Sequence, residues 1–398
     1  MSASRRTTVG VIFGGRSVEH DVSIVTAQQV MKAFDESRYE VVPIYISREG
    51  KWYSGQALRD LNAFKDERVH RQKGVVSVLL SPDVRHHGLI LNPIPQSVFT
   101  KPQIKRLDVL FPTVHGSHGE DGTLQGLFEL ADIPYVGFGT LASALSNDKL
   151  MTKQVLRQHG IPVLNEVAVT RSTWRLDSDV VLAQILDKVE LPAFVKPATL
   201  GSSIGVAKAD DAEQLRLSLD IAINFDRRAL VEPAVVDGVE INCSVIGYEN
   251  EIEVSVLEQP LAWSDFLGFE DKYLRGSKGM KSASRIIPAP LDEALTERIR
   301  HMSLEAFRAV DGRGIVRIDY LVKPTTGEVY LNEMNSMPGS LAFYLWQASG
   351  LQPAALLDRL IDLAQRAHAD KRRNIYDYKT NLLSVAALRG VKGTKGKA

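Results

Sequence analysis

Two short polar strings near the C-terminus, Arg317-Ile318-Asp319 and Glu333-Met334-Asn335, constrain the fold of this chain more than any other feature. Each string lies in an apolar run that is typical of a β-strand. Side chains two residues apart on a strand point to the same face, so each string places its polar ends on one face and its apolar middle on the other. The turn signal Lys-Pro-Thr-Thr-Gly at 323–327 separates the two runs and predicts a hairpin.

Such a hairpin would bring together the side chains that a metal and phosphate site requires. If the two polar faces coincide, the guanidinium of Arg317 meets three oxygen-bearing side chains, those of Asp319, Glu333 and Asn335. Oxygen donors of this kind suit Mg²⁺ that carries nucleotide phosphates. A solvated strand face is the alternative, but the residues around the strings are apolar and indicate a core. We therefore interpret the four side chains as a functional site.

Composition narrows the class of protein. The chain has 398 residues, enough for two or three domains, with 48 Lys plus Arg against 48 Asp plus Glu. This balance gives no electrostatic reason to expect nucleic acid or a membrane surface as a partner. A single cysteine, Cys243, excludes an internal disulfide framework and fits a reducing compartment. Because no apolar segment is long enough for a signal peptide or a membrane span, we expect a cytoplasmic protein.

Three units follow one another along the chain. The first opens with strand, helix and strand patterns, an order that predicts a parallel α/β domain. Residues 50–105 are harder to interpret, and no chemistry is assigned to them. The second unit is predicted to begin with one helix over 141–158. The predicted boundaries are 1–137 for the first unit, 138–232 for the central one, 233–372 for the third and 373–398 for a tail.

Small residues and lysines in the central unit indicate phosphate binding. The segment 200–205 contains two glycines and the serines Ser202 and Ser203, so its backbone N–H groups can approach a phosphate. A plain hairpin turn is the alternative. Lys196 shifts the balance, because a lysine within an apolar strand requires an anion or another partner. Lys149 is a second candidate, although a solvated helix lysine is the better explanation from its surroundings alone.

Two further segments suit a nucleotide site. A long basic loop, from about residue 260 to 284, contains Lys272 and Tyr273 and is predicted to be either a lid or a disordered segment. As a lid over an active site, it would close on the γ-phosphate and exclude water. Glu232 ends a strand, where backbone groups and one carboxylate can face an adenine edge. Glu240, beyond a turn, can accept hydrogen bonds from ribose hydroxyls. Ordinary surface residues are the alternative for both glutamates, and their assignment depends on the resemblance described next.

Set in chain order, these segments resemble the ATP-grasp superfamily and, within it, the D-alanine–D-alanine ligases. The motifs that carry the resemblance span most of the chain and lie at 14–23, 115–126, 142–149, 195–205, 272–274, 317–319 and 333–339. The resemblance implies a mixed α/β and α+β fold of three domains, with a Rossmann-like N-terminal domain and ATP between the central and C-terminal domains. It also implies a homodimer that joins two D-alanines through an acyl-phosphate for peptidoglycan precursor synthesis.

The resemblance also implies a role for individual residues around the first substrate. Glu19 resembles the carboxylate that holds the ammonium group of the first D-alanine, and His115 resembles its neighbour. Ser202 resembles the serine that joins Glu19 and Tyr273 in one hydrogen-bonded set. Arg317 and the Gly339 amide resemble the donors that stabilise the tetrahedral intermediate.

The remaining implied roles concern the nucleotide and its metal. The phosphate contacts implied by the resemblance are Lys149, Lys196, Ser202, Ser203 and Lys272. Glu232 and the Val235 backbone resemble the adenine contacts, and Glu240 resembles the ribose contact. Asp319, Glu333 and Asn335 resemble the ligands of two Mg²⁺ ions, for which Mn²⁺ is an alternative.

One segment departs from the family pattern. After Pro338-Gly339, where the family carries a serine-containing segment for the second D-alanine, this chain has Tyr344 and Leu345. The acceptor therefore stays open between D-alanine and D-lactate, D-serine or another amino acid, although Lys272-Tyr273 favours D-alanine. A nucleotide-binding regulator without turnover and a kinase are the alternatives from other classes.

Overall fold

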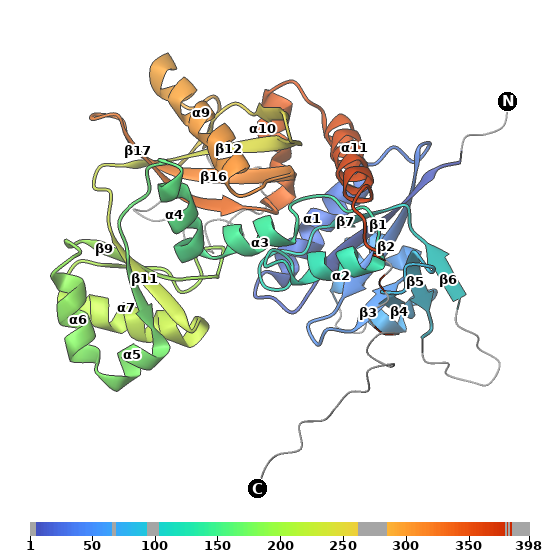
Figure 1. The fold of residues 1–398 in the computed structure, drawn as a ribbon, viewed down its shortest axis with the longest axis horizontal. Helices are drawn as coiled ribbons and strands as arrows, with labels where there is room; N and C mark the ends of the chain where they lie inside the picture. The colour runs from blue at the N-terminus through green and yellow to red at the C-terminus, as the bar shows by residue number, and fades with distance from the viewer. Residues whose placement is uncertain are drawn as a thin grey trace, which may run out of the picture.

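The computed structural model describes residues 5–65, 69–93, 103–261, 285–378, 380 and 383, and Figure 1 shows the arrangement of their helices and strands. The first unit is built on β1 (Thr7–Gly14), α1 (His20–Ala33), β2 (Tyr39–Ile46), β7 (Val109–Pro112) and α2 (Thr123–Ala131). Strand β1 lies between β2 and β7 and is parallel to both. It is buried from Thr8 to Gly14, as expected for a strand covered on both faces. The predicted parallel α/β start is confirmed.

The segment that the sequence left uninterpreted extends this sheet with antiparallel strands. They are β3 (Trp52–Ser54), β4 (Val76–Leu80), β5 (Gly88–Leu91) and β6 (Gln103–Arg106), with the 3₁₀ turns η1 (Gln56–Arg59), η2 (Leu61–Phe64) and η3 (Val69–Arg71). The strand order is β6-β5-β4-β3-β2-β1-β7. The sheet is therefore parallel at one end and antiparallel at the other.

The central unit holds an antiparallel sheet of order β10-β9-β11-β8. Its elements are α3 (Thr140–Asn147), α4 (Lys149–Gln158), β8 (Val167–Thr170), α5 (Arg171–Leu176), α6 (Ser178–Leu186), β9 (Ala193–Pro197), β10 (Ala207–Ala209), α7 (Ala212–Phe225) and β11 (Arg228–Pro233). The single helix expected over 141–158 is wrong, because Asp148 divides it. Asp148 has extended backbone angles, and its side chain accepts from the amides of Leu150 and Met151 as the cap of α4.

The third unit contains the predicted hairpin at one edge of a sheet of order β13-β12-β16-β17. Its elements are β12 (Val239–Tyr248), β13 (Glu251–Val254), β14 (Gln259–Pro260), β15 (Arg285–Ile286), α9 (Glu293–Ala309), β16 (Gly314–Lys323), β17 (Glu328–Asn335), η5 (Gly339–Ala342), α10 (Phe343–Ala348) and α11 (Pro353–Lys371). Lys272 and Tyr273 lie outside the described residues. None of the helices in the described ranges has the length and apolar character that a membrane crossing requires.

The first and third units share one hydrophobic core. Helix α11 lies beside β1 and β7 in Figure 1, and its Leu356 and Leu360 are fully buried in the same cluster as Val9 and Phe111. Burying such side chains is the main source of stability in a fold of this kind. The shared core fixes the third unit, with its hairpin, relative to the parallel strands of the first.

The junction of these units depends on close backbone packing at Gly314. Its φ of +74° lies in the left-handed region, and a Cβ there would come within 2.7 Å of the Gly137 Cα. We expect Gly314→Ala to lower the free energy of unfolding by about 3 kcal/mol or more, from backbone strain and the forced separation of two backbones. Chemical unfolding of the purified variant measures this loss.

Gly327→Ala is the matched control for this substitution. Gly327 has a similar φ of +72°, but a Cβ there would meet nothing within 4 Å. The Gly327→Ala variant should lose only about 1 kcal/mol of its free energy of unfolding, from the unfavourable backbone conformation alone. Equal losses in the two variants would show that the contact with Gly137 contributes nothing.

Candidate active site

The hairpin brings the two polar strings together as the sequence predicts. In the register of β16 and β17, Arg317 pairs with Asn335 and Asp319 pairs with Glu333. The Arg317 guanidinium donates from Nε and Nη2 to the two oxygens of Asp319, both at 2.6 Å, and Asn335 Nδ2 donates to Asp319 at 3.0 Å. Asp319 is only 1% exposed, so this bidentate ion pair compensates the loss of water around its charge.

A β-bulge adds a side chain that strand alternation does not predict. The register shifts between Asp319 and Tyr320, which leaves Asn332 as an extra residue on β17. At a bulge the alternation of faces is interrupted, and both Asn332 and Glu333 line the same cavity. Asn332 Oδ1 accepts from Lys196 Nζ at 2.8 Å. The third unit thereby contacts the phosphate lysine predicted in the central unit.

A cavity of about 630 Å³ lies between the central sheet and the third sheet. Its volume falls within the range of small-molecule sites. Several predicted nucleotide contacts line it together, namely Lys149, Lys196, Ser203, Val235, Glu240 and Glu333. The structure thus brings into one cavity residues that lie almost two hundred positions apart in the sequence.

The carboxylate of Glu232 lies between two lysines. It accepts from Lys196 and from Lys153, and it is 1% exposed. Burial alone would raise the pKa of Glu232, but the charges of Lys196 and Lys153 outweigh it and lower the pKa to about 2. The side chain is therefore an anchor for lysines. Because the Glu232 carboxylate is bound to two lysines, its side chain gives no support for the predicted contact with adenine. That contact stays a prediction for the backbone of this segment.

Lys149 is buried, whereas its sequence surroundings alone suggested a lysine exposed to solvent on a helix. The break at Asp148 places Lys149 at the first turn of α4, where its amide donates to the Ala198 carbonyl at 2.9 Å. Its Nζ donates to the Leu200 carbonyl at 2.6 Å and lies 3.7 Å from Glu333 Oε2. The ammonium group is thus fixed between the small-residue loop and the hairpin.

Glu19 and Ser202 connect the first unit to the central one. The Ser202 hydroxyl donates to Glu19 Oε1, and Glu19 is 6% exposed at the start of α1. Ser202 and Ser203 have φ values of +53° and +58°, so this loop holds two non-glycine residues in the left-handed region. Gly116 is required here, because a Cβ at that position would come within 2.4 Å of Glu19 Oε2.

His115 is held as a neutral imidazole. Burial lowers its pKa to about 4, despite a hydrogen bond to the Met337 backbone. Its Nε2 is 3.0 Å from the hydroxyl of Thr26 on α1. Its side chain is therefore an uncharged hydrogen-bonding group between Thr26 and the Met337 backbone.

Glu120 is a site residue that the sequence pattern did not reveal. Its carboxylate accepts from the Gly116 amide at 2.7 Å and from the Met337 amide at 2.8 Å, so it joins two loops of different units. Burial and the nearby charge of Glu19 raise the pKa of Glu120 to about 8, although both amides favour the ionised form. The signal for it is its place in the Gly-Glu-Asp-Gly segment at 119–122, next to His115.

The segment that departs from the family pattern is engaged in its own polar cluster. The Tyr344 hydroxyl donates to Glu258, which is 2% exposed, and the Arg285 guanidinium lies 3.9 Å from the centre of the Tyr344 ring. Burial and the charge of Glu258 raise the pKa of the Tyr344 hydroxyl, so it stays protonated. Leu345 is fully buried, and its side chain gives no support for a substrate contact.

Comparison with known proteins assigns a family to this arrangement. Residues 8–138 match the family model described as D-ala D-ala ligase N-terminus, and residues 155–362 match that described as D-ala D-ala ligase C-terminus. The D-alanine–D-alanine ligase of Thermosipho africanus is 38% identical over 377 residues, which covers 95% of this chain and 98% of the relative. The enzyme of the same name from Natranaerobius thermophilus is 39% identical over 380 residues, with 94% and 99% covered.

Solved structures agree in fold. The VanG D-Ala:D-Ser ligase from Enterococcus faecalis superposes with a TM-score of 0.77 and 30% identity over 90% of this chain and 100% of that one. The D-alanine–D-alanine ligase from Coxiella burnetii has a TM-score of 0.77 and 27% identity, with 97% and 99% covered. The three units, with their cavity between the central and third sheets, form the ATP-grasp fold. Within this class, the chain belongs to the D-alanine–D-alanine ligase family and is an enzyme.

The buried Glu232 cluster predicts a dependence of stability on pH. A carboxylate whose pKa is lowered from 4.5 to about 2 contributes stability above pH 4.5, and that contribution is lost as the pH falls towards 2. Replacing it leaves Lys153 and Lys196 without their counter-charge. We expect Glu232→Gln to cost about 3 kcal/mol at neutral pH and to reduce the loss of stability on acidification.

Glu253→Gln is the control for this substitution, because Glu253 pairs with Arg359 at 2.7 Å on the surface. It should change stability by less than about 1 kcal/mol. Denaturant unfolding from neutral pH to pH 3 measures both variants. An acid dependence of Glu232→Gln that is identical to that of the unmodified protein would contradict the role of the lysine cluster.

Proposed function

We propose that this chain joins two D-alanines in two steps that use ATP. A carboxylate is a poor acyl donor, and phosphorylation gives it a leaving group. In the first step a carboxylate oxygen of one D-alanine takes the γ-phosphoryl group, and ADP leaves. In the second step the free amine of the other D-alanine attacks the acyl carbon, a C–N bond forms, the C–O bond to phosphate breaks and the amine loses a proton.

The link between Ser202 and Glu19 is the observation that carries this proposal. Ser202 belongs to the loop that follows Lys196 on β9, and Lys196 and the neighbouring Ser203 line the nucleotide cavity. Glu19 belongs to the first unit, and its carboxylate has the charge that an ammonium group requires. One loop therefore joins the phosphate side of the site to the amino-acid side, as phosphoryl transfer to a bound D-alanine requires.

The protein residues assigned to the first substrate have complementary roles. The Glu19 carboxylate holds the substrate ammonium, and neutral His115 lies beside it. Arg317 and the Gly339 amide donate hydrogen bonds to the oxygen that becomes negative when the amine attacks. The structure holds the Arg317 plane through Asp319, so the guanidinium is oriented before the substrate arrives. Lys272 and Tyr273, in the segment outside the described residues, complete the predicted set as a lid.

The donor set on the hairpin fits Mg²⁺. Asp319, Glu333 and Asn335 offer carboxylate and amide oxygens, which are the ligands that this ion prefers, and Glu333 lines the nucleotide cavity. When bound, Mg²⁺ or Mn²⁺ supplies positive charge to the phosphate oxygens. Lys149 and Lys196 supply further positive charge from the opposite wall. Glu240 lines the same cavity, and we assign it to the ribose hydroxyls.

An observation at the predicted site of the second substrate favours a related function with a different acceptor. Tyr344 stands where the family carries a serine-containing segment, and its hydroxyl is already bound to Glu258. The structural relative at 30% identity is a D-Ala:D-Ser ligase. A ligase with D-serine, D-lactate or another amino acid as acceptor is therefore the second candidate, with the same first step.

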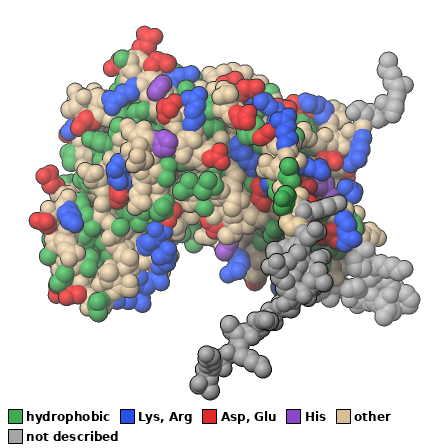
Figure 2. Space-filling model, viewed as in Figure 1, with side chains coloured by type: hydrophobic (Ala, Val, Ile, Leu, Met, Phe, Trp, Pro, Cys, Tyr) green, Lys and Arg blue, Asp and Glu red, His purple; other side chains and the backbone are tan. Residues whose placement is uncertain are grey.

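The setting of the reaction follows from the proposed role in peptidoglycan precursor synthesis. D-alanine and ATP are small cytoplasmic metabolites, so we place the enzyme in the cytoplasm. The family resemblance leads us to expect a homodimer. Figure 2 shows acidic and basic side chains mixed over the face in view, outside the grey atoms. On this face, the mixture of charges gives no reason to expect nucleic acid as a partner.

Incubation with ATP, Mg²⁺ and a panel of D-amino and D-hydroxy acids tests the function. We expect ADP release that requires D-alanine and a product with the mass of D-alanyl-D-alanine. A dominant mixed product would favour the second candidate. A folded sample that releases phosphate without forming any ligated product would contradict both candidates.

Substitution of the hairpin carboxylate tests the metal site. We expect Asp319→Asn to reduce kcat about 100-fold or more, because charge at the transferring phosphoryl group is lost, while ATP affinity changes less than about tenfold. Glu328→Gln, an exposed carboxylate at the other end of β17, is the control and should leave kcat unchanged. Steady-state kinetics and ATP titration measure these effects. Parallel losses of kcat and ATP affinity in Asp319→Asn would mean that the predicted metal role is wrong.

A further inference from the structure

The loop that carries Gly339 continues into a strained backbone segment. Ser340, Leu341 and Ala342 have φ values of +50°, +49° and +48°, so three consecutive residues with side chains occupy the left-handed region. Each such residue costs roughly 1–2 kcal/mol relative to a right-handed conformation. All three are buried, with Leu341 and Ala342 fully so. A segment of this kind persists only where its surroundings determine its conformation.

The first unit supplies these surroundings. On α1, the Thr26 hydroxyl accepts from the Ser340 amide at 3.3 Å, and Gln29 accepts from the Ser340 hydroxyl. On the other side of Gly339, His115 hydrogen-bonds the Met337 backbone. Side chains of the first unit therefore bind the loop both before and after the residue whose amide is the proposed oxyanion donor.

Glu120 has the central place among these contacts. Its Oε1 accepts from the Met337 amide at 2.8 Å and from the Ser336 hydroxyl at 3.3 Å. Its Oε2 accepts from the Gly116 amide at 2.7 Å, so the same carboxylate also fixes the loop that follows His115. One side chain thus sets the distance between the loop beside Glu19 and the loop that leads to Gly339.

We propose that Glu120 is a positioning residue for the ligation step, which holds the Gly339 amide in register with the first substrate by fixing residues 336 and 337. The proposal rests on the proposed role of Gly339 and extends it to a residue in another domain. Glu120 does not contact the reacting atoms in this account. It acts through the Met337 amide and through the strained segment that follows.

Loss of this contact has a chemical signature that a general loss of stability does not share. If the oxyanion donor is displaced, attack by the amine slows, but phosphorylation of D-alanine continues. The acyl-phosphate then has time to react with water, which returns D-alanine and phosphate without forming a peptide bond. The ratio of phosphate released to dipeptide formed therefore rises above one. Partial unfolding lowers both quantities together and leaves the ratio at one.

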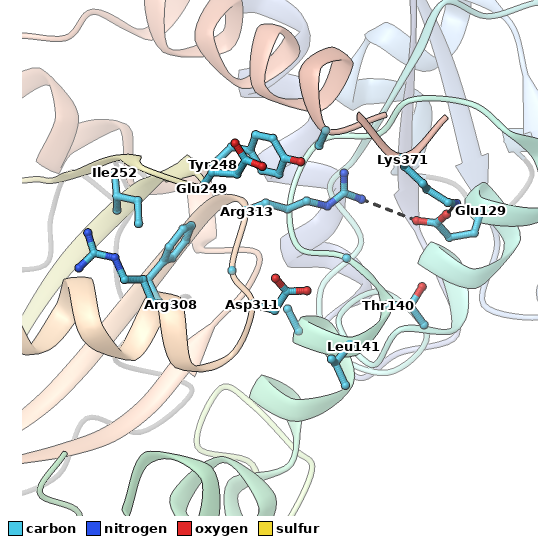
Figure 3. A pocket seen from close by; sticks show the side chains of 15 residues that line it. Glu129, Thr140, Leu141, Tyr248, Glu249, Ile252, Arg308, Asp311, Arg313 and Lys371 are labelled. Carbon is cyan, nitrogen blue, oxygen red and sulfur yellow. Dashed lines mark ion pairs between the residues drawn. The ribbon is translucent and has the colours of Figure 1, made fainter. Parts of the chain in front are cut away.

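A second carboxylate of the first unit provides a matched control. Glu129 on α2 also contacts the third unit, through ion pairs with Lys371 and, at 3.9 Å, with Arg313. Figure 3 shows these residues at a pocket of about 540 Å³, and among the described residues that line it there is none of the proposed site. Removal of the Glu129 side chain weakens contacts between the first and third units without affecting the Gly339 loop.

The experiment compares Glu120→Ala, Glu120→Gln and Glu129→Ala in the full-length enzyme with ATP, Mg²⁺ and D-alanine. Assays are run above the pKa of about 8, where Glu120 is ionised. We expect Glu120→Ala to reduce dipeptide formation about 100-fold, as for a misplaced catalytic group, with a phosphate-to-dipeptide ratio well above one. Glu120→Gln keeps one acceptor oxygen and should fall between this variant and the unmodified enzyme. The KM for ATP should stay within about threefold, because the lysines of its cavity are unchanged.

The outcomes separate this inference from the proposed function. A ratio of one in both Glu120 variants would overturn the positioning role, as would an equal rise in Glu129→Ala. If Glu120→Ala does not fold, the ratio in Glu120→Gln decides. Arg317→Gln tests the oxyanion site itself. A raised ratio in Arg317→Gln with a ratio of one in Glu120→Gln removes only the role of Glu120, whereas a ratio of one in Arg317→Gln removes the oxyanion assignment.

Discussion

The pairing of β16 with β17 is the constraint on which the site depends. A slip of one residue would move every side chain of one strand to the opposite face and separate the carboxylates. The bidentate contact between Arg317 and Asp319 counters such a slip, because a buried carboxylate without a partner costs several kcal/mol. Apolar residues on the other face, such as Ile318 and Met334, enter the core and fix the same register.

Polar contacts between units then assemble the rest of the site around this hairpin. Ser202 reaches Glu19, Lys196 reaches Asn332, and Glu120 reaches Met337. Each contact joins residues from different units, so the residues of the candidate site meet only when the units are packed together. Lys153 and Lys196 of the central unit are buried and require an anion, which the Glu232 carboxylate supplies in the structure described here. In the proposed function, bound phosphate would add a second anion at the same place, so one cluster would both stabilise the fold and bind substrate.

The sequence predicted those parts of the site that depend on local periodicity. The strand alternation around Arg317 and Asp319 required no knowledge of distant residues, and the turn signal at 323–327 predicted the hairpin. The bulge at Asn332 could not be predicted, because an extra residue in a strand leaves the alternation pattern ambiguous. Lys153 was missed for another reason. Its partner Glu232 lies 79 positions away, and no local pattern indicates that a helix lysine will be buried against it.

The same distinction explains the fold. The parallel strands at the N-terminus were recognisable as apolar runs, whereas the short strands of residues 50–105 gain their stability from pairing with β2 and with one another. The single helix expected over 141–158 divides at Asp148, because a cap that serves the amides of α4 outweighs the continuous helical pattern. The break at Asp148 also places Lys149 beside the loop of Ser202, where its Nζ donates to the Leu200 carbonyl.

An isotope-transfer measurement tests the central claim most directly. D-alanine labelled with ¹⁸O in its carboxylate is incubated with ATP and Mg²⁺, and the inorganic phosphate is analysed by mass. If the carboxylate attacks the γ-phosphorus and the amine then displaces phosphate from the acyl carbon, each dipeptide formed leaves one labelled oxygen in the phosphate. Dipeptide accompanied by unlabelled phosphate would show that no acyl-phosphate forms, and the account of the site would be wrong.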